Sequence, residues 1–234
     1  MQSPTYATRR EQLTTYFDQT AAAAWEALTS DAPVSRIRQT VRAGRDDMRN
    51  HLLASLPQDL SGQRVLDAGC GTGALAIEAA RRGADVCAID VAENLVAVAR
   101  ERCPEDLGGG SVRFEVGDMC APELGEFDHV VAMDSLIHYD ADDIVDVLSG
   151  LCRRTRHSVL FTFAPRTPAL SAMHLVGRLI PSDAHRAPAI VPVSHQQLKR
   201  QLVRELFSFG WQPAGSHRVS SAFYKSHAME LRRE

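Results

Sequence analysis

The stretch that most constrains the fold is Arg64–Gly73, with the sequence RVLDAGCGTG. It begins as a short apolar run, which is typical of a buried strand in a parallel sheet. It continues with three glycines at alternate positions, and glycine permits sharp turns and a close approach to a ligand. A strand, a glycine-rich turn and the start of a helix together predict a nucleotide-binding corner.

Length and charge limit the possible classes of protein. The 234 residues are enough for one domain of about 150–200 residues with an extension. A net charge of −3 excludes an overall field that would recruit nucleic acid or an anionic membrane. The five cysteines include no C-x-x-C pair, so neither a zinc site nor a disulfide framework is expected. We find no signal peptide and no run of about 18 apolar residues, and therefore expect a cytoplasmic protein without a transmembrane segment.

The hydrophobic pattern divides the chain into two parts. Residues 1–60 are expected to form a helical N-terminal cover, with helices over 6–29 and 35–55. Residues 61–234 alternate between strand and helix patterns, which predicts an α/β fold with a mostly parallel sheet. The expected strands are 64–68, 85–89, 112–116, 127–133, 158–164, 212–218 and 222–230, and the expected helices are 73–82, 92–102, 141–153 and 194–208.

Two segments allow more than one interpretation. Residues 165–193 interrupt the alternation with five prolines and an apolar helical piece over 170–180. An insertion of this length is usually functional, so it is either a lid over the active site or a helix that completes the core. The second expected helix carries a row of arginines, which forms either a solvated face or a wall that faces an anion. These residues are Arg36, Arg38, Arg42, Arg45 and Arg49.

Acidic residues near the glycine turn discriminate between nucleotides. The turn also satisfies the dinucleotide pattern G-x-G-x-x-G/A, so a dinucleotide oxidoreductase is an alternative. Asp67, however, would repel a pyrophosphate and attract an ammonium group. Asp90 ends the second strand and can accept from ribose hydroxyls, and Asp118 follows the third strand and can accept from an adenine amino group. These acids predict a ligand with an amino group, a ribose and an adenine but no phosphate, which describes S-adenosylmethionine.

The sequence resembles the class I S-adenosylmethionine-dependent methyltransferases. Residues 65–73 (VLDAGCGTG) are similar to their first motif, and Asp90, residues 117–119 (GDM) and residues 127–131 (FDHVV) are similar to later ones. The resemblance implies a Rossmann-like sheet of seven strands with the last strand antiparallel. We expect the cofactor to bind at the strand ends, with contacts to Asp67, Gly69, Cys70, Gly71, Asp90, Val91, Asp118, Met119 and Met133.

A narrower resemblance, which spans nearly the whole chain, is to the magnesium-protoporphyrin O-methyltransferases of the bacteriochlorophyll branch. It rests on residues 16–18 (YFD) with Trp25, residues 34–45 (VSRIRQTVRAGR), residues 133–139 (MDSLIHY) and residues 161–165 (FTFAP). It implies methylation of one propionate of Mg-protoporphyrin IX, with S-adenosylhomocysteine as the second product. It also implies catalytic roles for Tyr16 and His138, and the magnesium chelatase large subunit as a partner. The apolar insertion is expected to dock there or to touch a membrane surface.

Methylation of a carboxylate, the reaction that this resemblance implies, does not require a strong base from the protein. A propionic acid resembles glutamic acid, with a pKa of about 4.3, and is ionised near neutral pH, so alignment and exclusion of water matter more than a strong base. His138 can position the propionate, remove a proton if the acid binds neutral, or merely cap its loop. The Tyr16 hydroxyl can form a hydrogen bond to the substrate, or the ring can pack the N-terminal cover onto the core. Arg38 or Arg42 can pair with a propionate. Tyr139 is expected to be structural and is also a candidate for substrate contact.

Several alternatives stay open from the sequence. A methyltransferase for a quinone or phenol would need a true base, so loss of His138 would abolish its activity. A non-catalytic module that binds S-adenosylmethionine is a second alternative. The spacing of the remaining histidines suggests no metal held by the protein alone, and His174 and His185 are candidates for touching the magnesium of the substrate.

Overall fold

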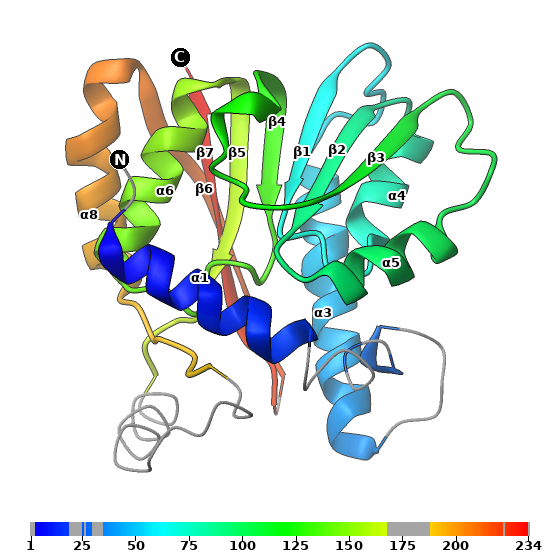
Figure 1. Ribbon diagram of the computed structural model, residues 1–234. Coiled ribbons are helices and arrows are strands. Elements are labelled where there is room, and N and C mark those ends of the chain that lie inside the picture. Colours follow the sequence, from blue (N-terminus) through cyan, green and yellow to red (C-terminus); the bar gives the residue numbers. More distant parts are fainter. Residues whose placement is uncertain are drawn as a thin grey trace.

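A seven-stranded sheet forms the centre of the protein, in the order β3-β2-β1-β4-β5-β7-β6 (Figure 1). This computed structural model describes residues 3–18, 25, 27–29, 35–167, 188–221 and 223–233. The strands are β1 (Arg64–Ala68), β2 (Asp85–Asp90), β3 (Ser111–Val116), β4 (Phe127–Ala132), β5 (Thr155–Phe163), β6 (Trp211–Ser220) and β7 (Lys225–Arg233). The first five pair in parallel, and β7 is antiparallel to both β5 and β6. The predicted sheet is therefore confirmed.

Helices pack on the sheet through two apolar clusters. One cluster joins the sheet to α1, α6 and α8, and includes Leu13, Leu148 and Leu202; the other joins it to α3 and α4, and includes Leu52 and Ala76. The helices are α1 (Pro4–Tyr16), α3 (Arg36–Ser55), α4 (Ala74–Arg81), α5 (Glu93–Arg102), α6 (Ala141–Arg153) and α8 (His195–Leu206), with 3-10 turns η2 (Pro122–Leu124) and η3 (Phe207–Phe209). Within the described ranges, no helix is long and apolar enough to span a bilayer.

Most expected elements agree with the structure to within three residues, and the first helix differs. It begins at Pro4 because Ser3 accepts a hydrogen bond from the Tyr6 N–H, and it ends at Tyr16 rather than running to residue 29. The last strand begins at Lys225 rather than 222, after a turn closed by hydrogen bonds between residues 221 and 224. The apolar piece expected over 170–180 lies outside the described residues.

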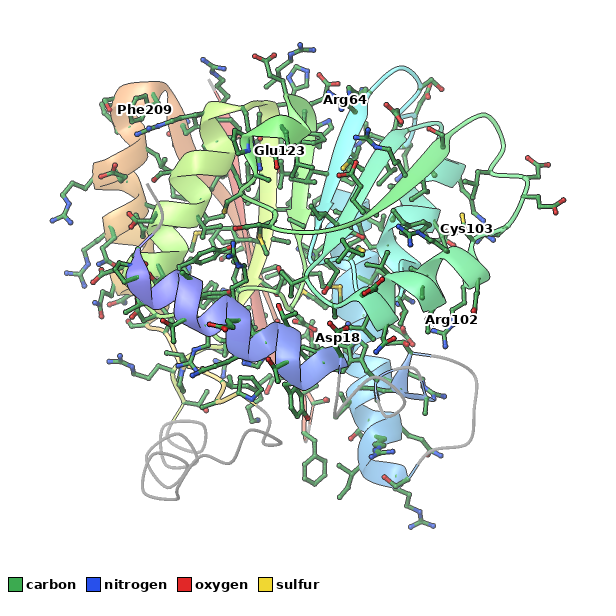
Figure 2. The ribbon with its side chains drawn as sticks, in the orientation of Figure 1. Asp18, Arg64, Arg102, Cys103, Glu123 and Phe209 are labelled. Atoms are coloured by element: carbon green, nitrogen blue, oxygen red, sulfur yellow. The ribbon has the colours of Figure 1, made fainter. Side chains whose placement is uncertain are left out.

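Side-chain caps determine where several helices begin. Ser35 caps α3, Asp140 caps α6 and Ser194 caps α8, each by accepting from backbone N–H groups of the first turn. The residue before α5 provides no such cap. Asp18, two residues after α1, caps the first turn of α5 instead (Figure 2). Its carboxylate accepts a hydrogen bond from the Asn94 N–H at 3.1 Å. The N-terminal cover is thus tied to the helix that follows β2.

The helix α1 crosses the sheet along the edge where the parallel strands end (Figure 1). Polar contacts hold it there at two further points. The Thr5 hydroxyl donates to Asp143 of α6 at 2.8 Å, and the Tyr6 hydroxyl donates to Asp118, after β3, at 2.7 Å. Arg10 also pairs with Asp118. Since the carboxyl ends of parallel strands are where such folds bind ligands, α1 forms one wall of the expected site.

Candidate active site

A cavity of about 560 Å³ lies at the carboxyl ends of β1, β2 and β4. Its walls come from the glycine turn after β1, the loop after β4, and the helices α1 and α3. It brings together nearly all of the site residues predicted from the sequence. These are Tyr16, Arg38, Arg42, Asp67, Gly69, Cys70, Gly71, Asp90, Val91, Met119, Met133, His138 and Tyr139. Asp118 is the predicted site residue that is not part of this lining.

The glycine turn between β1 and α4 has a backbone that side chains would obstruct. Gly69, Gly71 and Gly73 have φ values of 85°, 53° and 80°, in the left-handed region. A Cβ atom on Gly69 would lie 2.3 Å from the Cβ of Ser135, and one on Gly73 would lie 2.9 Å from the ring of Phe114. Conformation therefore favours glycine at all three positions, and space requires it at Gly69 and Gly73.

Two carboxylates from neighbouring strands lie beside this turn, Asp67 buried and Asp90 half-buried. Asp67 is 2% exposed, and its Oδ2 has no hydrogen-bond partner among the residues that the structure describes. Asp90 accepts from the N–H groups of Gly71 (2.8 Å) and Ala92 (3.0 Å). Burial raises the pKa of Asp67 to about 7, with a further contribution from the charge of Asp90, and burial also raises the pKa of Asp90. Buried carboxylates of this kind fit a positively charged ligand such as S-adenosylmethionine.

The carboxylate of Asp118 is directed toward α1. It accepts from the Tyr6 hydroxyl, from Arg10 and from the N–H of Cys120, the last at 2.9 Å. Its sequence neighbour Met119 does line the cavity. The sequence placed Asp118 correctly after β3, but the donors on α1 could not be foreseen from strand patterns. The adenine contact expected for Asp118 stays a prediction.

The loop after β4, residues 133–139, brings His138 and Tyr139 to the cavity. His138 is 9% exposed, and its Nδ1 lies 3.3 Å from the carbonyl oxygen of Ala189. Because a carbonyl only accepts, this contact assigns the proton to Nδ1 and leaves Nε2 as an acceptor. Burial lowers the pKa of His138 to about 4, so the ring is neutral near pH 7. The ring of Tyr139 stacks on Tyr6 at 4.9 Å, which favours the structural interpretation of Tyr139.

An aromatic cluster lines the cavity on the side of the N-terminal cover. The rings of Tyr16 and Phe17 meet edge to face at 5.1 Å, and those of Phe17 and Trp25 at 5.5 Å. A Cβ on Gly71 would lie 3.4 Å from the Trp25 Nε1, so the cluster reaches the glycine turn. Tyr16 thus both packs with the cover and faces the cavity, and its two interpretations are compatible.

The basic face of α3 forms a wall of the cavity, which favours the second interpretation of its arginines. Those that line the cavity are Arg38, Arg42, Arg45 and Arg49. Arg42 donates to the carbonyl oxygens of Leu28 (2.9 Å) and Ala27 (2.7 Å), and so supports the segment that carries Trp25. Arg38 is exposed, and its side chain has no ion-pair partner among the described residues. Arg38 is therefore better placed than Arg42 to bind an anion.

Sequence reasoning missed several residues of the site. Tyr6, Ser135 and Ile190 line the cavity without having been proposed for it. Ser135 could have been found, because it lies in the loop that follows β4. Tyr6 and Ile190 come from segments whose place depends on tertiary packing, and the sequence gives no local signal for them.

The histidines considered for the magnesium of the substrate add little to this site. His174 and His185 lie outside the described residues. Across the ranges that the structure does describe, no group of three or more His, Cys, Asp or Glu side chains is arranged to hold a metal ion.

The fold and the site define a class I S-adenosylmethionine-dependent methyltransferase. The sheet order, the single antiparallel strand, the glycine turn after β1 and the acids that end β1 and β2 are all present. A model of the methyltransferase domain matches residues 65–158. The structure is similar to crystal structures of the magnesium protoporphyrin IX methyltransferase from Synechocystis. With bound SAH the TM-score is 0.77 at 27% identity, covering 95% of this chain and 98% of that one. With bound SAM it is 0.77 at 25% identity, covering 97% of each.

Within that class, the chain belongs to the magnesium-protoporphyrin O-methyltransferase family. The family model described as the magnesium-protoporphyrin IX methyltransferase C-terminus matches residues 132–233. The chain is 47% identical to the magnesium-protoporphyrin O-methyltransferase of Rhodobacter capsulatus, over 97% of this chain and 98% of that protein. The resemblance stated from the sequence is therefore confirmed.

Proposed function

We propose that this chain transfers a methyl group from S-adenosylmethionine to a propionate of Mg-protoporphyrin IX, giving the monomethyl ester used in (bacterio)chlorophyll biosynthesis. Membership of the family supports this reaction. The observation that carries the proposal is that one cavity is lined both by carboxylates from β1 and β2 and by arginines from α3. A cationic donor and an anionic acceptor each find opposite charge there.

The donor half of the cavity is built from the glycine turn and the strand ends. The cofactor supplies a methyl group on a positively charged sulfur. Asp67 accepts from its ammonium group and Asp90 from its ribose hydroxyls. We assign further contacts to residues 69–71, Val91, Met119 and Met133, which line the same cavity and are mostly apolar or backbone groups. These residues bind and orient the donor and exclude water from it.

The acceptor half is formed by α3 and the N-terminal cover. Arg38 binds the propionate, because a guanidinium matches a carboxylate with two parallel hydrogen bonds. Arg42 acts indirectly, since its donors hold the carbonyls of residues 27 and 28. The hydroxyl of Tyr16 is a hydrogen-bond donor on the same wall, and it aligns the carboxylate oxygen with the methyl group. Tyr139 contributes by packing.

His138 acts in this scheme as a neutral hydrogen-bond acceptor. With a pKa near 4 it carries no charge at neutral pH and does not repel the sulfonium. Its Nε2 can take the proton of a propionic acid that enters in the neutral form. Donation from His138 to a bound carboxylate would require the imidazolium, which burial disfavours. At neutral pH no imidazolium is present to donate, whereas proton transfer from a neutral propionic acid to Nε2 is nearly balanced, because the pKa of the acid is about 4.3 and that of His138 is about 4. We therefore assign proton removal, rather than donation, to His138.

Incubation with S-adenosylmethionine and Mg-protoporphyrin IX, followed by mass spectrometry, tests this proposal. The expected product is a porphyrin heavier by one methylene, and an unchanged porphyrin would refute the acceptor. Arg38→Gln should raise KM for the porphyrin by about tenfold, because it removes a charged hydrogen-bonded contact. Arg36→Gln is the matched control, because Arg36 lies on the same helix but outside the cavity lining. Turnover of a phenolic quinone precursor instead, abolished in His138→Ala, would favour the alternative acceptor.

We also propose that the magnesium chelatase large subunit delivers the porphyrin, and that the insertion at 165–193 docks on it or on a membrane surface. Ile190, in the described part of this insertion, lines the cavity and is 40% exposed. Residues 1–60 would then act as a cover and residues 61–234 as the catalytic domain. Co-sedimentation with the chelatase subunit, and separately with anionic phospholipid vesicles, distinguishes the two surfaces.

A further inference from the structure

The residue directly after Met133, Asp134, has an unusual backbone and a crowded environment. Its φ is 55°, and no other non-glycine residue in the described ranges has a positive φ. This conformation disfavours most side chains, although Asp and Asn adopt it more readily than others. Asp134 lines the cavity in the same loop as His138. Strain of this kind persists where surrounding contacts hold the residue in place.

The contacts that hold Asp134 come from three separate elements. Arg45 of α3 forms an ion pair with its carboxylate at 2.5 Å. The Tyr224 hydroxyl, just before β7, donates to it at 3.0 Å, and the Thr162 hydroxyl of β5 donates at 3.2 Å. The Asp134 N–H in turn donates to the Thr162 hydroxyl oxygen at 2.7 Å. The side chains of Asp134 and Arg45 are only 4% and 17% exposed, so this is a largely buried charge pair with its hydrogen bonds satisfied.

The network continues from Arg45 into the N-terminal cover. The Arg45 guanidinium lies over the ring of Trp25, 4.5 Å from its centre. Trp25 contacts Phe17, which contacts Tyr16, through the edge-to-face pairs described above. A continuous set of contacts therefore runs from the loop of His138 through α3 to Tyr16. Tyr16 is at one end of this set of contacts, and Asp134, four residues before His138 in the same loop, is at the other.

We infer that Asp134 is a positioning residue. It acts through Arg45 and Trp25, and so fixes the position of Tyr16, on the N-terminal cover, relative to the loop that carries His138. This inference rests on the proposed function, because it concerns alignment of the acceptor carboxylate with the methyl group. Alignment is sensitive to small displacements, and a shift of about 1 Å costs about a hundredfold in rate. The carboxylate of Asp134 does not itself bind donor or acceptor, because its oxygens are occupied by protein groups.

The test begins with Asp134→Asn, which keeps the size and the tolerance for positive φ but removes the charge. We expect kcat to fall about tenfold or more, while the dissociation constant for S-adenosylmethionine changes by less than about twofold. Tyr224→Phe is the matched control, because it removes one neutral donor to the same carboxylate and leaves the ion pair. It should lower kcat by less than about threefold. Equal losses in the two variants would overturn the inference.

Two further measurements test the inference, and the first of them does not depend on how well Asp134→Asn folds. Arg45→Lys keeps the charge but loses the planar group over Trp25, so acrylamide quenching of Trp25 fluorescence should rise about twofold, with Trp25→Phe giving the background from Trp211. The double variant Asp134→Asn with Arg45→Gln should be about as slow as either single variant. Unchanged quenching, or multiplicative losses in the double variant, would overturn the inference. Wild-type turnover is measured first: if it is absent, the proposed function fails, while the quenching still tests the network.

Discussion

Replacing Asp67 by Asn tests the physical basis of the donor site. Asp67 is buried at the end of β1, and its Oδ2 has no hydrogen-bond partner among the described residues. Its pKa is raised to about 7, first by burial and then by the charge of Asp90. The unfolded chain has the ordinary value of about 3.9. The folded protein without cofactor therefore binds the Asp67 proton more tightly than the unfolded chain does.

The change in the free energy of unfolding with pH follows, in sign and size, from this difference in pKa. The contribution of Asp67 to stability is greatest below about pH 4, where the group is protonated in both states, and it falls as the pH rises to about 7. A shift of about three pKa units at about 1.4 kcal/mol each corresponds to about 4 kcal/mol above pH 7. At pH 5.5 the same calculation gives about 2 kcal/mol. Asn cannot ionise, so Asp67→Asn should gain about these amounts relative to wild type.

Urea unfolding at pH 5.5 and pH 8.0, without cofactor, measures both values. The gap between Asp67→Asn and wild type should widen by about 2 kcal/mol between the two pH values. With S-adenosylmethionine added, wild type should gain more stability at pH 8.0 than at pH 5.5, and the variant should not. A gap that stays constant between the two pH values would refute the reasoning. Asp90→Asn is the contrast, because it loses an acceptor for the Gly71 or Ala92 N–H and should be destabilised at both pH values.

Three further substitutions test other parts of the site. His138→Ala should lower kcat about a hundredfold, and wild-type kcat should show no step near pH 6.5, because the pKa of His138 is near 4; a step there that disappears in the variant would contradict this. Gly69→Ala should weaken S-adenosylmethionine binding at least about tenfold, measured by calorimetry, because its φ of 85° disfavours a side chain and its Cβ would meet the loop after β4. Gly62→Ala, with a φ of 74° and open space around it, is its control. Tyr6→Phe should lower the free energy of unfolding by about 1.5 kcal/mol, because it removes a hydrogen bond to the charged Asp118; an unchanged urea midpoint would show that this contact is not stabilising.

The sequence predicts the donor half of the site because that half is built from local signals. Each parallel strand reads as an apolar run, and its last residue is placed at the ligand edge by topology alone. Asp67 and Asp90 needed only their positions at the ends of β1 and β2 to be identified. The glycine turn needed only its spacing, which the positive φ values explain. These features do not depend on how the N-terminal cover packs.

The acceptor half depends on long-range packing, and there the sequence is less informative. Asp118 follows β3 as expected, yet its carboxylate is taken by Tyr6 and Arg10 from more than a hundred residues earlier. Arg42 was a candidate for the propionate, but its donors hold the carbonyls of residues 27 and 28. Asp134 lies in the loop after β4, and the pattern gave no indication that it pairs with Arg45 of α3. Contacts between the N-terminal cover and the rest of the chain can be identified only once the positions of the helices are known.

The charge distribution of the cavity suggests how the two halves work as one site. Asp67, Asp90 and Arg38 line the same cavity. In the proposed scheme the two carboxylates provide negative charge for the donor, and Arg38 provides positive charge for the acceptor. Methyl transfer from a sulfonium to a carboxylate removes one positive and one negative charge together. After the reaction, the ester no longer attracts Arg38, whereas S-adenosylhomocysteine keeps the ammonium group and the ribose hydroxyls that Asp67 and Asp90 bind in this scheme. The electrostatic contact that binds the acceptor is therefore the one that weakens when products form, so the residue that aligns the propionate also favours release of the ester.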